Sequence, residues 1–300
     1  MNGLIPQVLR EHVAFAPYIK SLERLGSRDL YAHCNDQPSG VFPTPRGGGA
    51  RGEGAANPAE LGSSARSLTP TLSTGEREHS RGAIPTFVSP PARALSAIEF
   101  ERRVVEKNEL IVRPDSLHDV LNALVWLTFP KTKRAISEAH VALGVNPDPK
   151  TRPRRRDVLT VFDESGMIVL SERDDLRELN RSHQWRELFV NRRSDFIEQT
   201  RPILFGHGAM EQLGQQLPQV HRGLTVKALW LPLPVTTSTF DLDNRLAERI
   251  ERGDSLHEAE RTVPLPVLGI PGWFAENEAP ECYDDTSVFR PKRSAFQQQL

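Results

Sequence analysis

The sequence predicts an α+β fold: a mainly helical single domain with a β-hairpin or small sheet and an extended C-terminal arm. Several stretches of the 300-residue chain repeat apolar residues at the 3.6-residue period of an amphipathic helix. Short runs rich in Val, Ile and Leu have the composition of β-strands. From Pro264 onward the chain carries Pro and Gly at short intervals, which indicates an arm without long regular elements.

Two helical regions are predicted before residue 110. Residues 4–25 are rich in helix-forming residues and are interrupted near Pro17. Residues 94–107 place their apolar side chains at helical spacing. Both regions flank a segment of very different composition.

Two further helices are predicted in the middle of the chain. Residues 117–129 have a broad apolar face, with Asp115 or Ser116 as a candidate N-cap. Pro130 should end this helix, because proline cannot continue the hydrogen-bond ladder. A second helix over residues 133–143 should end at Gly144.

The segment DVLTVFDESGMIVL predicts a β-hairpin. Residues 158–162 and 167–170 form its strands, and Gly166 suits a left-handed turn position. The two carboxylates of FDESG, Asp163 and Glu164, could bind a metal or act as acid and base, but acidic residues also start turns. We therefore interpret them first as turn residues.

The remaining elements complete the α+β pattern. Residues 176–199 are predicted to be helical, and GLTVKALWLP predicts a strand ended by Pro232. A helix over residues 242–252 should be capped by Asp241 or Asp243. In the C-terminal arm, four aromatic residues are expected to anchor the chain on the core: Trp273, Phe274, Tyr283 and Phe289.

Residues 36–82 predict a disordered, low-complexity insertion. Of these 47 residues, 20 are Gly, Pro or Ser, and only five are large and apolar. So little apolar surface cannot offset the entropy lost on ordering the segment. Its SLTPTLSTGEREHSRG also resembles translated intergenic repeats of bacterial genomes. We expect residues 1–35 and 83–300 to form one domain; a natural linker between two domains is the alternative.

Composition excludes several classes of protein. The net charge of −1 gives no reason to expect a nucleic-acid or anionic-membrane partner. No apolar run approaches the roughly 18 residues of a membrane span, and the first residues lack the apolar core of a signal peptide. The two cysteines, Cys34 and Cys282, are too isolated for a disulfide framework or a cysteine zinc site. We expect a cytoplasmic protein.

His118, Asp119 and Asn122 form the first candidate site. On a helix these residues are neighbours, so three polar groups cluster in the first two turns. Adjacent His-Asp supplies metal ligands in HD-type phosphohydrolases, but no upstream histidine here has the matching context, and no metal is assigned. The groups could instead cap the helix and bond a neighbouring loop, or line a metal-free pocket with His118 as general base.

His140 and His207 are further candidates. Antiparallel packing of the helices on either side of Pro130 would bring His140 toward His118, although a histidine also suits a helix C-terminus structurally. His207 lies in FGHG, where flanking glycines allow close approach of a ligand, and a helix follows whose free N–H groups point at this loop. A structural turn is the alternative for His207.

A basic run offers candidate substrate-binding residues. Residues 131–156 contain eight basic and two acidic residues, which gives this segment a net charge of +6. Arg154, Arg155 and Arg156 could bind a phosphate or carboxylate, since a guanidinium binds such groups bidentately. The alternative is neutralisation by the acidic C-terminal arm. Nucleic acid is not expected, because no aromatic residues alternate with the basic ones.

Five motifs carry a resemblance: RPDSLHDVLNALVWLTFPKTK, RRRDVLTVFDESGMIV, WRELFVNRR, LFGHGAMEQL and PLPVLGIPGWFAENEAPECYDDTSVFRP. In this order they resemble the proteobacterial family known as domain of unknown function 3025. The resemblance covers nearly everything except residues 36–82 and implies a cytoplasmic bacterial protein without an established activity or assigned residues. Leu117 stands where the family pattern has Trp, which weakens any role for an aromatic ring there. Ile136-Ser137 replaces Leu-Asn.

Two classes of function follow from the sequence. The first is a small-molecule enzyme or binder whose pocket is lined by His118, Asp119, Asn122, His140 and His207, with Arg154–Arg156 meeting an anionic substrate. The second is a non-catalytic interaction or structural protein in which these polar residues are structural. A cleft holding two of the histidines would favour the first class. Cofactor, reaction and oligomeric state are not predicted.

Overall fold

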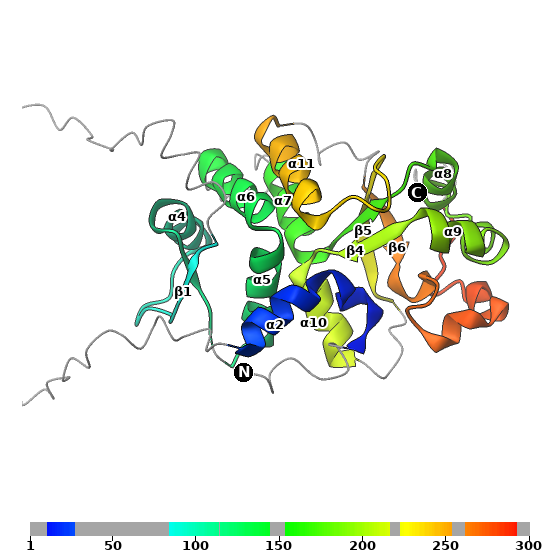
Figure 1. Ribbon diagram of the computed structural model, residues 1–300, viewed down its shortest axis with the longest axis horizontal. Coiled ribbons are helices and arrows are strands. Elements are labelled where there is room, and N and C mark those ends of the chain that lie inside the picture. The colour runs from blue at the N-terminus through cyan, green and yellow to red at the C-terminus, as the bar shows by residue number, and fades with distance from the viewer. Residues whose placement is uncertain are drawn as a thin grey trace, which may run out of the picture.

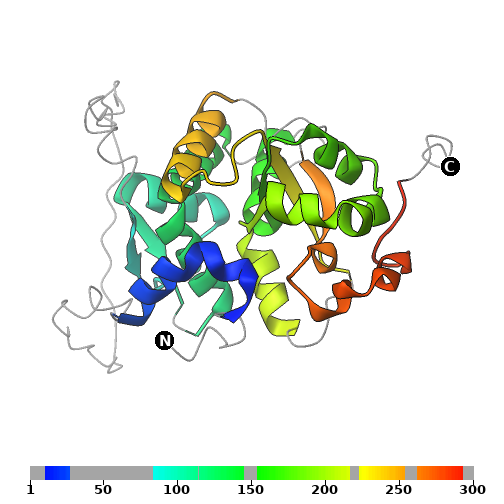
Figure 2. The same ribbon diagram turned by 45° about the vertical axis from the view of Figure 1, so that its right-hand side comes forward.

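The computed structural model describes residues 11–27, 84–113, 115–144, 154–216, 223–253 and 262–292 (Figure 1). The fold is α+β and mainly helical, as the sequence predicts. The insertion predicted at residues 36–82 lies outside the described residues, so its boundaries stay predictions. The described chain forms a β1–α4–β2 unit at one end, helices α5 and α6 in the middle, and a four-stranded sheet at the other end (Figures 1 and 2).

The larger sheet has the strand order β4-β3-β5-β6. Its central strands, β3 (Gly166–Leu170) and β5 (Thr225–Leu231), are parallel; β4 (Arg201–Leu204) and β6 (Thr262–Pro266) pair antiparallel at the edges. Every residue of β3 is buried, which explains its uninterrupted apolar sequence MIVL. The sheet forms the centre of the main hydrophobic core.

Helices from several parts of the chain flank this sheet. Near the N-terminus lie η1 (Val13–Tyr18) and α2 (Ile19–Ser27). The others are α7 (Arg154–Ser165), α8 (Asp174–Arg181), η2 (Glu187–Asn191), α9 (Arg193–Gln199), α10 (His207–Gln216) and α11 (Thr239–Glu251). None of the described helices has the length and apolar character needed to cross a membrane.

A smaller unit lies beside the four-stranded sheet and its flanking helices. β1 (Thr86–Val88) and β2 (Glu109–Ile111) pair in parallel and are joined by α4 (Ala97–Lys107). Ser96 and Glu99 form a capping box at the start of α4, which fixes where the helix begins. This unit packs through α4 against α6 (Pro130–Leu143).

The helix pair α5 (Leu117–Thr128) and α6 confirms the predictions around Pro130. Ser116 caps α5, and Pro130 occupies the first turn of α6, where its missing N–H costs nothing. The cap predicted for α11 was wrong: Ser238 caps that helix. Asp243 instead accepts hydrogen bonds from the backbone N–H groups of Lys131 and Thr132, and so caps α6 from a neighbouring helix.

The hairpin predicted over residues 158–170 was wrong. Residues 154–165 are helix α7, and the neighbours of β3 are β4 and β5. Leu159 and Phe162, three positions apart, are buried, while Val161 is 42% exposed. The run of β-branched residues suits a strand locally, but the core takes up one helical face. Asp163 and Glu164 therefore lie in the last turn of a helix.

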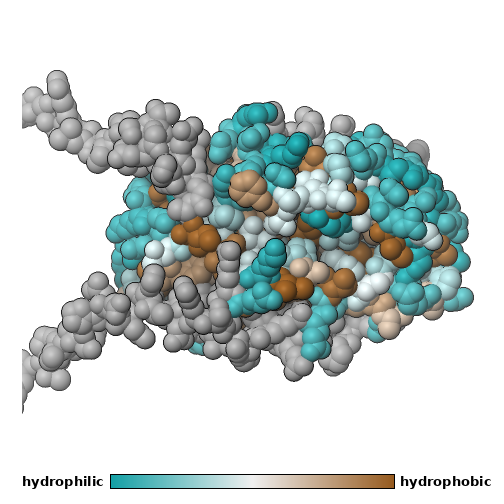
Figure 3. All heavy atoms as spheres, in the orientation of Figure 1, coloured by the Kyte–Doolittle hydropathy of each residue, from teal (hydrophilic) through white to brown (hydrophobic). Residues whose placement is uncertain are grey.

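The C-terminal segment packs on the core, as predicted from its aromatic residues. It begins as strand β6 and continues through η3 (Val267–Gly269), η4 (Ala275–Glu278) and η5 (Pro280–Asp284). Trp273, Phe274, Tyr283 and Phe289 are all buried. In the view of Figure 3 the described apolar side chains appear only in small groups among polar ones.

Candidate functional site

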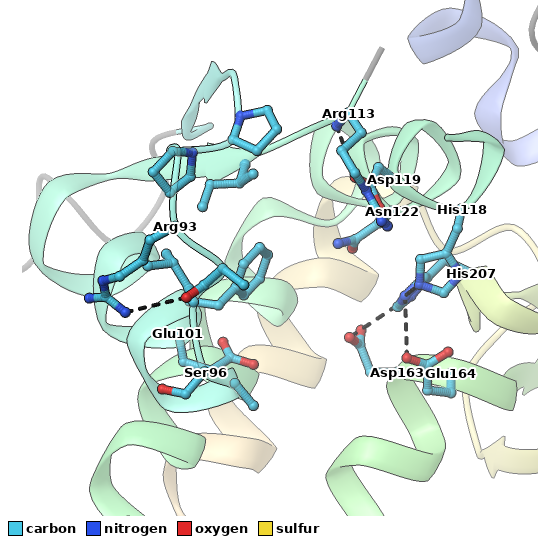
Figure 4. A pocket seen from close by; sticks show the side chains of 17 residues that line it. Arg93, Ser96, Glu101, Arg113, His118, Asp119, Asn122, Asp163, Glu164 and His207 are labelled. Atoms are coloured by element: carbon cyan, nitrogen blue, oxygen red, sulfur yellow. Dashed lines mark hydrogen bonds and ion pairs between the residues drawn. The ribbon is translucent and has the colours of Figure 1, made fainter. Parts of the chain in front are cut away.

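A cavity of about 560 Å³ lies between the β1–α4–β2 unit and helices α5, α7 and α10. Figure 4 shows its two sides: His118, Asp163, Glu164 and His207 group on one side, and Arg93 and Glu101 lie on the other. This volume is in the range of sites for small molecules.

His118 and His207 meet at the cavity because α5 packs against α10. His118 is in the first turn of α5, and His207 is the first residue of α10. Their Nε2 atoms lie 3.1 Å apart, and the rings are edge-on at 70°. The side chain of His207 is only 4% exposed, whereas the side chain of His118 is 34% exposed.

A carboxylate lies near Nδ1 of each histidine ring. Glu211, one turn after His207 on α10, lies 2.8 Å from Nδ1 of His118. Asp163 Oδ2 lies 3.9 Å from Nδ1 of His207, a nitrogen that is buried without a hydrogen-bond partner among the described residues. Such carboxylate–histidine pairs orient the ring so that Nε2 points away from the carboxylate. In this structure the Nε2 atoms of His118 and His207 lie next to each other.

Glu164 completes the group. Its Oε1 lies 3.5 Å from Nε2 of His207, and His118, Glu164 and His207 each offer one ligand atom within 4.8 Å of the others. Two nitrogens on one tetrahedral Zn²⁺, each bound at about 2.0–2.1 Å, lie about 3.4 Å apart. The observed spacing of 3.1 Å is therefore close to that of a shared metal ion.

The two glycines of FGHG allow Glu164 to approach His207. A Cβ at Gly206 would lie 2.5 Å from the backbone nitrogen of Ser165 and 2.6 Å from the carbonyl of Glu164. A Cβ at Gly208 would lie 2.5 Å from Glu164 Oε2. The sequence analysis expected these glycines to admit a ligand; in the structure they admit the end of α7.

Burial sets the charge of these groups. Burial lowers the pKa of His207 to about 4, so its ring is neutral at neutral pH and able to bind a metal. Burial raises the pKa of Glu164 above its usual value. Burial would also raise the pKa of Asp163, but the charge and hydrogen bond of Lys133, together with the charge of His207 when that ring is protonated, outweigh it and hold that pKa below its usual value.

The group carries excess negative charge. Lys133, with a side chain 4% exposed, pairs with Asp163 and, in the part of the chain that the structure describes, is the lysine or arginine in direct contact with the group. Asp163, Glu164 and Glu211 set three negative charges against that one positive charge, a net charge of −2. A divalent cation would neutralise it. Charges left unbalanced at a partly buried site are costly, so this surplus favours a bound cation.

The structure brings together four of the five predicted histidine, aspartate and asparagine candidates. His118, Asp119, Asn122 and His207 line the cavity. Asp119 fits the structural alternative: its carboxylate accepts the backbone N–H of Arg113, just before α5, at 2.8 Å. It also pairs bidentately with the Arg113 guanidinium at 2.8 and 2.9 Å, and these contacts keep its pKa low despite burial. Oδ1 of Asn122 is buried without a hydrogen-bond partner among the described residues.

His140 does not reach His118. Its Nδ1 lies 3.1 Å from Glu101 Oε1, and its Nε2 lies 3.5 Å from Thr160 Oγ1. His140 therefore links α6 to α4 and to α7. The expected approach of His140 to His118 does not occur, because the ring of His140 contacts α4 and α7 instead.

Two of the three predicted substrate-binding arginines, Arg155 and Arg156, are engaged away from the cavity. Arg155 donates to the backbone carbonyl of Ile250 at 2.5 Å, and Arg156 donates to that of Gly144. Both guanidiniums thus bond carbonyls at the C-terminal ends of helices, a structural use of cationic side chains. The side chain of Arg154 lies outside the described residues.

Two carboxylates of the site were predicted to have a structural role. The sequence pattern predicts a hairpin where the structure has α7, so Asp163 and Glu164 were expected in its turn. Glu211 carried an available signal: it follows His207 by four positions, so both lie on one helix face. Lys133 carried none, since its contact with Asp163 depends on how α6 packs against α7.

Comparison with known proteins identifies the family but no activity. No curated protein and no solved structure matches the chain. Residues 86–293 match the family described as "Protein of unknown function (DUF3025)", and the chain therefore belongs to this family, as its five motifs predict.

Proposed function

We propose that this protein is a metal-dependent enzyme that acts on a small molecule, with a divalent cation held by His118, His207 and Glu164. The observation that carries the proposal is that ligand atoms of all three residues lie within 4.8 Å of one another, with the two Nε2 atoms 3.1 Å apart and Glu164 Oε1 3.5 Å from Nε2 of His207. A cleft with two of the predicted histidines favours an enzyme or binder over the alternative of a purely structural role.

Hydrogen bonding around the rings supports a cation between them. If Nδ1 of His118 donates to Glu211 and His207 is neutral with its proton toward Asp163, both Nε2 atoms present lone pairs to each other at 3.1 Å. Two lone pairs at this distance repel each other, and a metal ion between them removes the repulsion. Without a metal the two rings form a hydrogen bond in one of two ways: a His118 imidazolium donates to both Glu211 and His207, or a neutral His207 protonated at Nε2 donates to Nε2 of His118.

Three protein ligands leave an open position for water. Two histidines and one carboxylate are the ligand set of several catalytic zinc sites, in which the metal lowers the pKa of bound water to about 7. The open side of this group faces the cavity, where a substrate can enter. The chemistry that the site supports best is hydrolysis by metal-bound hydroxide.

Metal titration tests the proposal. The purified protein, stripped with a chelator, is titrated with Zn²⁺, Mn²⁺ and Co²⁺, and bound metal is measured by elemental analysis and by the visible spectrum of the Co²⁺ form. We expect about one ion per chain in the parent. His118→Ala, His207→Ala and Glu164→Gln should each lower the affinity at least tenfold.

His183→Asn provides the matched control. His183 lies away from the cavity, where its Nδ1 contacts the carbonyl of Arg290, and asparagine tolerates its positive φ of 58°. This variant should bind metal like the parent. A parent protein that binds no more metal than the His118→Ala/His207→Ala double variant would overturn the proposal and favour a direct hydrogen bond between the two rings. The expected cytoplasmic location stays a prediction.

A further inference from the structure

We infer that the substrate carries a carboxylate, and that Arg113 binds this group while another part of the substrate meets the metal. This inference rests on the proposed metal site and deepens it by naming the class of substrate. It keeps the anionic substrate expected from the sequence but assigns it to an arginine outside the predicted basic run. Three observations carry it: how Arg113 is held, which of its donors are free, and where it lies in the cavity wall.

Arg113 is held in one position at the cavity wall. Its Nε and Nη2 donate to the two carboxylate oxygens of Asp119 at 2.8 and 2.9 Å, and its backbone N–H donates to the same carboxylate at 2.8 Å. Asp119 lies in the first turn of α5 and has a side chain only 14% exposed. A free arginine side chain loses rotamer freedom when it binds a ligand, whereas Asp119 has already ordered this one. Arg113 is therefore pre-organised for binding.

The end of the Arg113 guanidinium is free. A guanidinium has five N–H donors, and Asp119 occupies one on Nε and one on Nη2. In the part of the chain that the structure describes, the N–H groups that remain on Nη1 and Nη2 meet no acceptor. The side chain is 59% exposed, so a ligand can reach this end. Parallel N–H groups on Nη1 and Nη2 match the two oxygens of a carboxylate.

Arg93 also lines the cavity, but it offers no such free end. Its Nη1 and Nη2 already donate to the two carboxylate oxygens of Glu99 at 3.2 and 2.7 Å, and Nη1 also lies 3.3 Å from the carbonyl oxygen of Ala94. An anionic group would have to displace Glu99 in order to bind Arg93 in the same way. The contacts of the two arginines therefore select Arg113 as the group that binds an anion.

Arg113 lies on the side of the cavity that holds the proposed metal ligands. Asp119, which holds Arg113, directly follows His118 in the chain. The hydrogen bonds and charge of Asp119 raise the pKa of Arg113, and the charge of Glu211 adds to this effect. Glu211 also contacts Nδ1 of His118 at 2.8 Å, so Arg113 and His118 have a neighbour in common. Figure 4 shows Arg113 and Asp119 on the same side as the histidine pair, so one substrate can reach both the metal and Arg113.

The charges around the loaded site suit a monoanion. The three carboxylates and the lysine around the histidines have a net charge of −2, which a divalent cation cancels, and the pair of Arg113 and Asp119 is neutral as well. Asp115 is exposed, so salt screens its charge, and Glu101 lies on the other side of the cavity, where it contacts His140. One guanidinium neutralises a carboxylate, whereas a phosphate dianion would keep one uncompensated charge. A carboxylate therefore fits this site better than a phosphate.

The test uses matched pairs of hydroxamic acids on the Zn²⁺-loaded protein. The monohydroxamic acids of succinic, glutaric and adipic acid chelate the metal through the hydroxamate and carry a free carboxylate at increasing distance. Their primary amides have the same shape without the charge. At the best chain length we expect the carboxylate to bind at least about tenfold more tightly than its amide, as measured by calorimetry, which corresponds to one charge-assisted contact. The phosphonate of the same length should bind more weakly than the carboxylate.

The double variant Arg113→Met/Asp119→Asn separates a direct contact with Arg113 from a change in charge. It removes one positive and one negative charge, so the local net charge stays the same, and the asparagine can still accept the backbone N–H at position 113. In this variant the preference for the carboxylate over the amide should fall below about threefold. Arg113→Lys keeps the charge but loses the parallel N–H groups, so it should keep only part of the preference.

Arg186→Met/Asp284→Asn is the matched control. It makes the same substitutions in another exposed arginine–aspartate pair, with 2.6 Å between Arg186 Nη1 and Asp284 Oδ1, and neither residue lines the cavity. This variant should keep the full preference for the carboxylate. Elemental analysis of every sample verifies that the metal is still bound.

Each outcome decides between the alternatives. Equal affinities for carboxylate and amide at every chain length in the metal-loaded parent would overturn the inference, and this result does not depend on how any variant folds. An unchanged preference in Arg113→Met/Asp119→Asn would also overturn it, because the anion would then bind elsewhere. A phosphonate that binds more tightly than the carboxylate would replace the carboxylate with a phosphoryl group. Absence of bound metal in the parent would overturn the proposed function together with this inference, and the metal analysis distinguishes that result from the others.

Discussion

Nε2 of His118 lies 3.1 Å from Nε2 of His207, although 89 positions separate the two residues in the chain. Neither ring is held by its own helix alone. Glu211 on α10 contacts His118 on α5, while Asp163 and Glu164 on α7 contact His207 on α10. Three helices therefore fix the geometry of the pair together, as a site that must hold a ligand with precision requires.

Asp163→Asn should weaken metal binding about 10- to 100-fold, because a carboxylate behind a metal-binding histidine orients the ring and raises its basicity. Competition with a chelating dye measures the affinity. The variant also leaves Lys133 buried without its charge partner, which costs about 3–5 kcal/mol of stability.

The double variant Asp163→Asn/Lys133→Met separates these two effects. It should recover most of the stability but not the metal affinity. Asp195→Asn, in a half-exposed ion pair with Arg192, is the control and should leave metal binding unchanged. Full metal affinity in the double variant would show that Asp163 has no part in orienting His207.

The metal-free protein should lose stability as the pH falls from about 6.5 to about 4. The pKa of His207 is lowered to about 4 by burial, so the unfolded chain binds a proton in this window and the folded chain does not. Stability is therefore complete above the unfolded pKa and decreases on acidification. A shift of this size corresponds to about 3 kcal/mol.

Urea unfolding at several pH values, in the presence of chelator, measures this effect. His207→Gln cannot take up the proton, so its stability should change less between pH 7 and pH 4 than that of the parent. Parallel pH curves for the two proteins would mean that His207 is protonated as easily in the folded protein as in the unfolded chain.

Gly206→Ala should destabilise the protein by about 1–3 kcal/mol, the range for overpacked sites. Its Cβ would press on the backbone of Glu164 and Ser165, which has little freedom to move. Thermal melting measures the loss. If Gly206→Ala melts like the parent, the end of α7 does not pack on this loop as closely as described.

Gly208→Ala should act differently, because its Cβ would meet Oε2 of the flexible Glu164 side chain at 2.5 Å and the backbone oxygen of Glu164 only at 3.0 Å. Melting should fall less than in Gly206→Ala, since alanine also favours the helix. Metal affinity should fall, because the carboxylate must swing away from His207. Unchanged affinity would remove Glu164 from the ligand set.

Trp273→Ala should destabilise the protein by about 3 kcal/mol, as expected for a buried aromatic side chain. Trp273 is 8% exposed and packs edge-on against the ring of His12 at 5.9 Å between ring centres. Thermal and urea unfolding measure the loss, and Trp273→Phe should retain most of the stability. An unchanged melting curve in Trp273→Ala would mean that the C-terminal segment is only loosely attached in solution.

Deletion of residues 36–82 should leave the cooperative unfolding transition intact. This segment has few large apolar side chains that could add to a core. The entropy cost of closing a loop also depends only weakly on its length, so a shorter connection should change the stability little. Differential scanning calorimetry of the deletion variant tests this. Loss of the cooperative transition would place the segment in the folded core.

The sequence by itself determined those elements whose local signals agree with one another. Apolar periodicity and the Ser116 cap specify where α5 begins, and Pro130 specifies where it ends. The start of α6 at Pro130, three residues earlier than predicted, also depends on the distant Asp243, which accepts from the N–H groups of Lys131 and Thr132. His118 and His207 were predicted as candidates from their local context, since His118 shares a helix face with Asn122 and His207 lies between glycines ahead of a helix, although a structural role stayed open for both. Family membership also followed from sequence alone, since five ordered motifs carry it.

Only the tertiary structure decided which of these residues act together. VLTVF suits either a strand or a helix, and the burial of Leu159 and Phe162 against the core selects α7. That choice turns Asp163 and Glu164 from turn residues into groups facing His207. In the same way, the packing of α10 on α5 joins His207 to His118, while that of α4 on α6 assigns His140 to Glu101. Local propensities differ by about 1 kcal/mol or less per residue, whereas burial of one large apolar side chain contributes about 1.5–3 kcal/mol, so packing prevails where local signals are ambiguous.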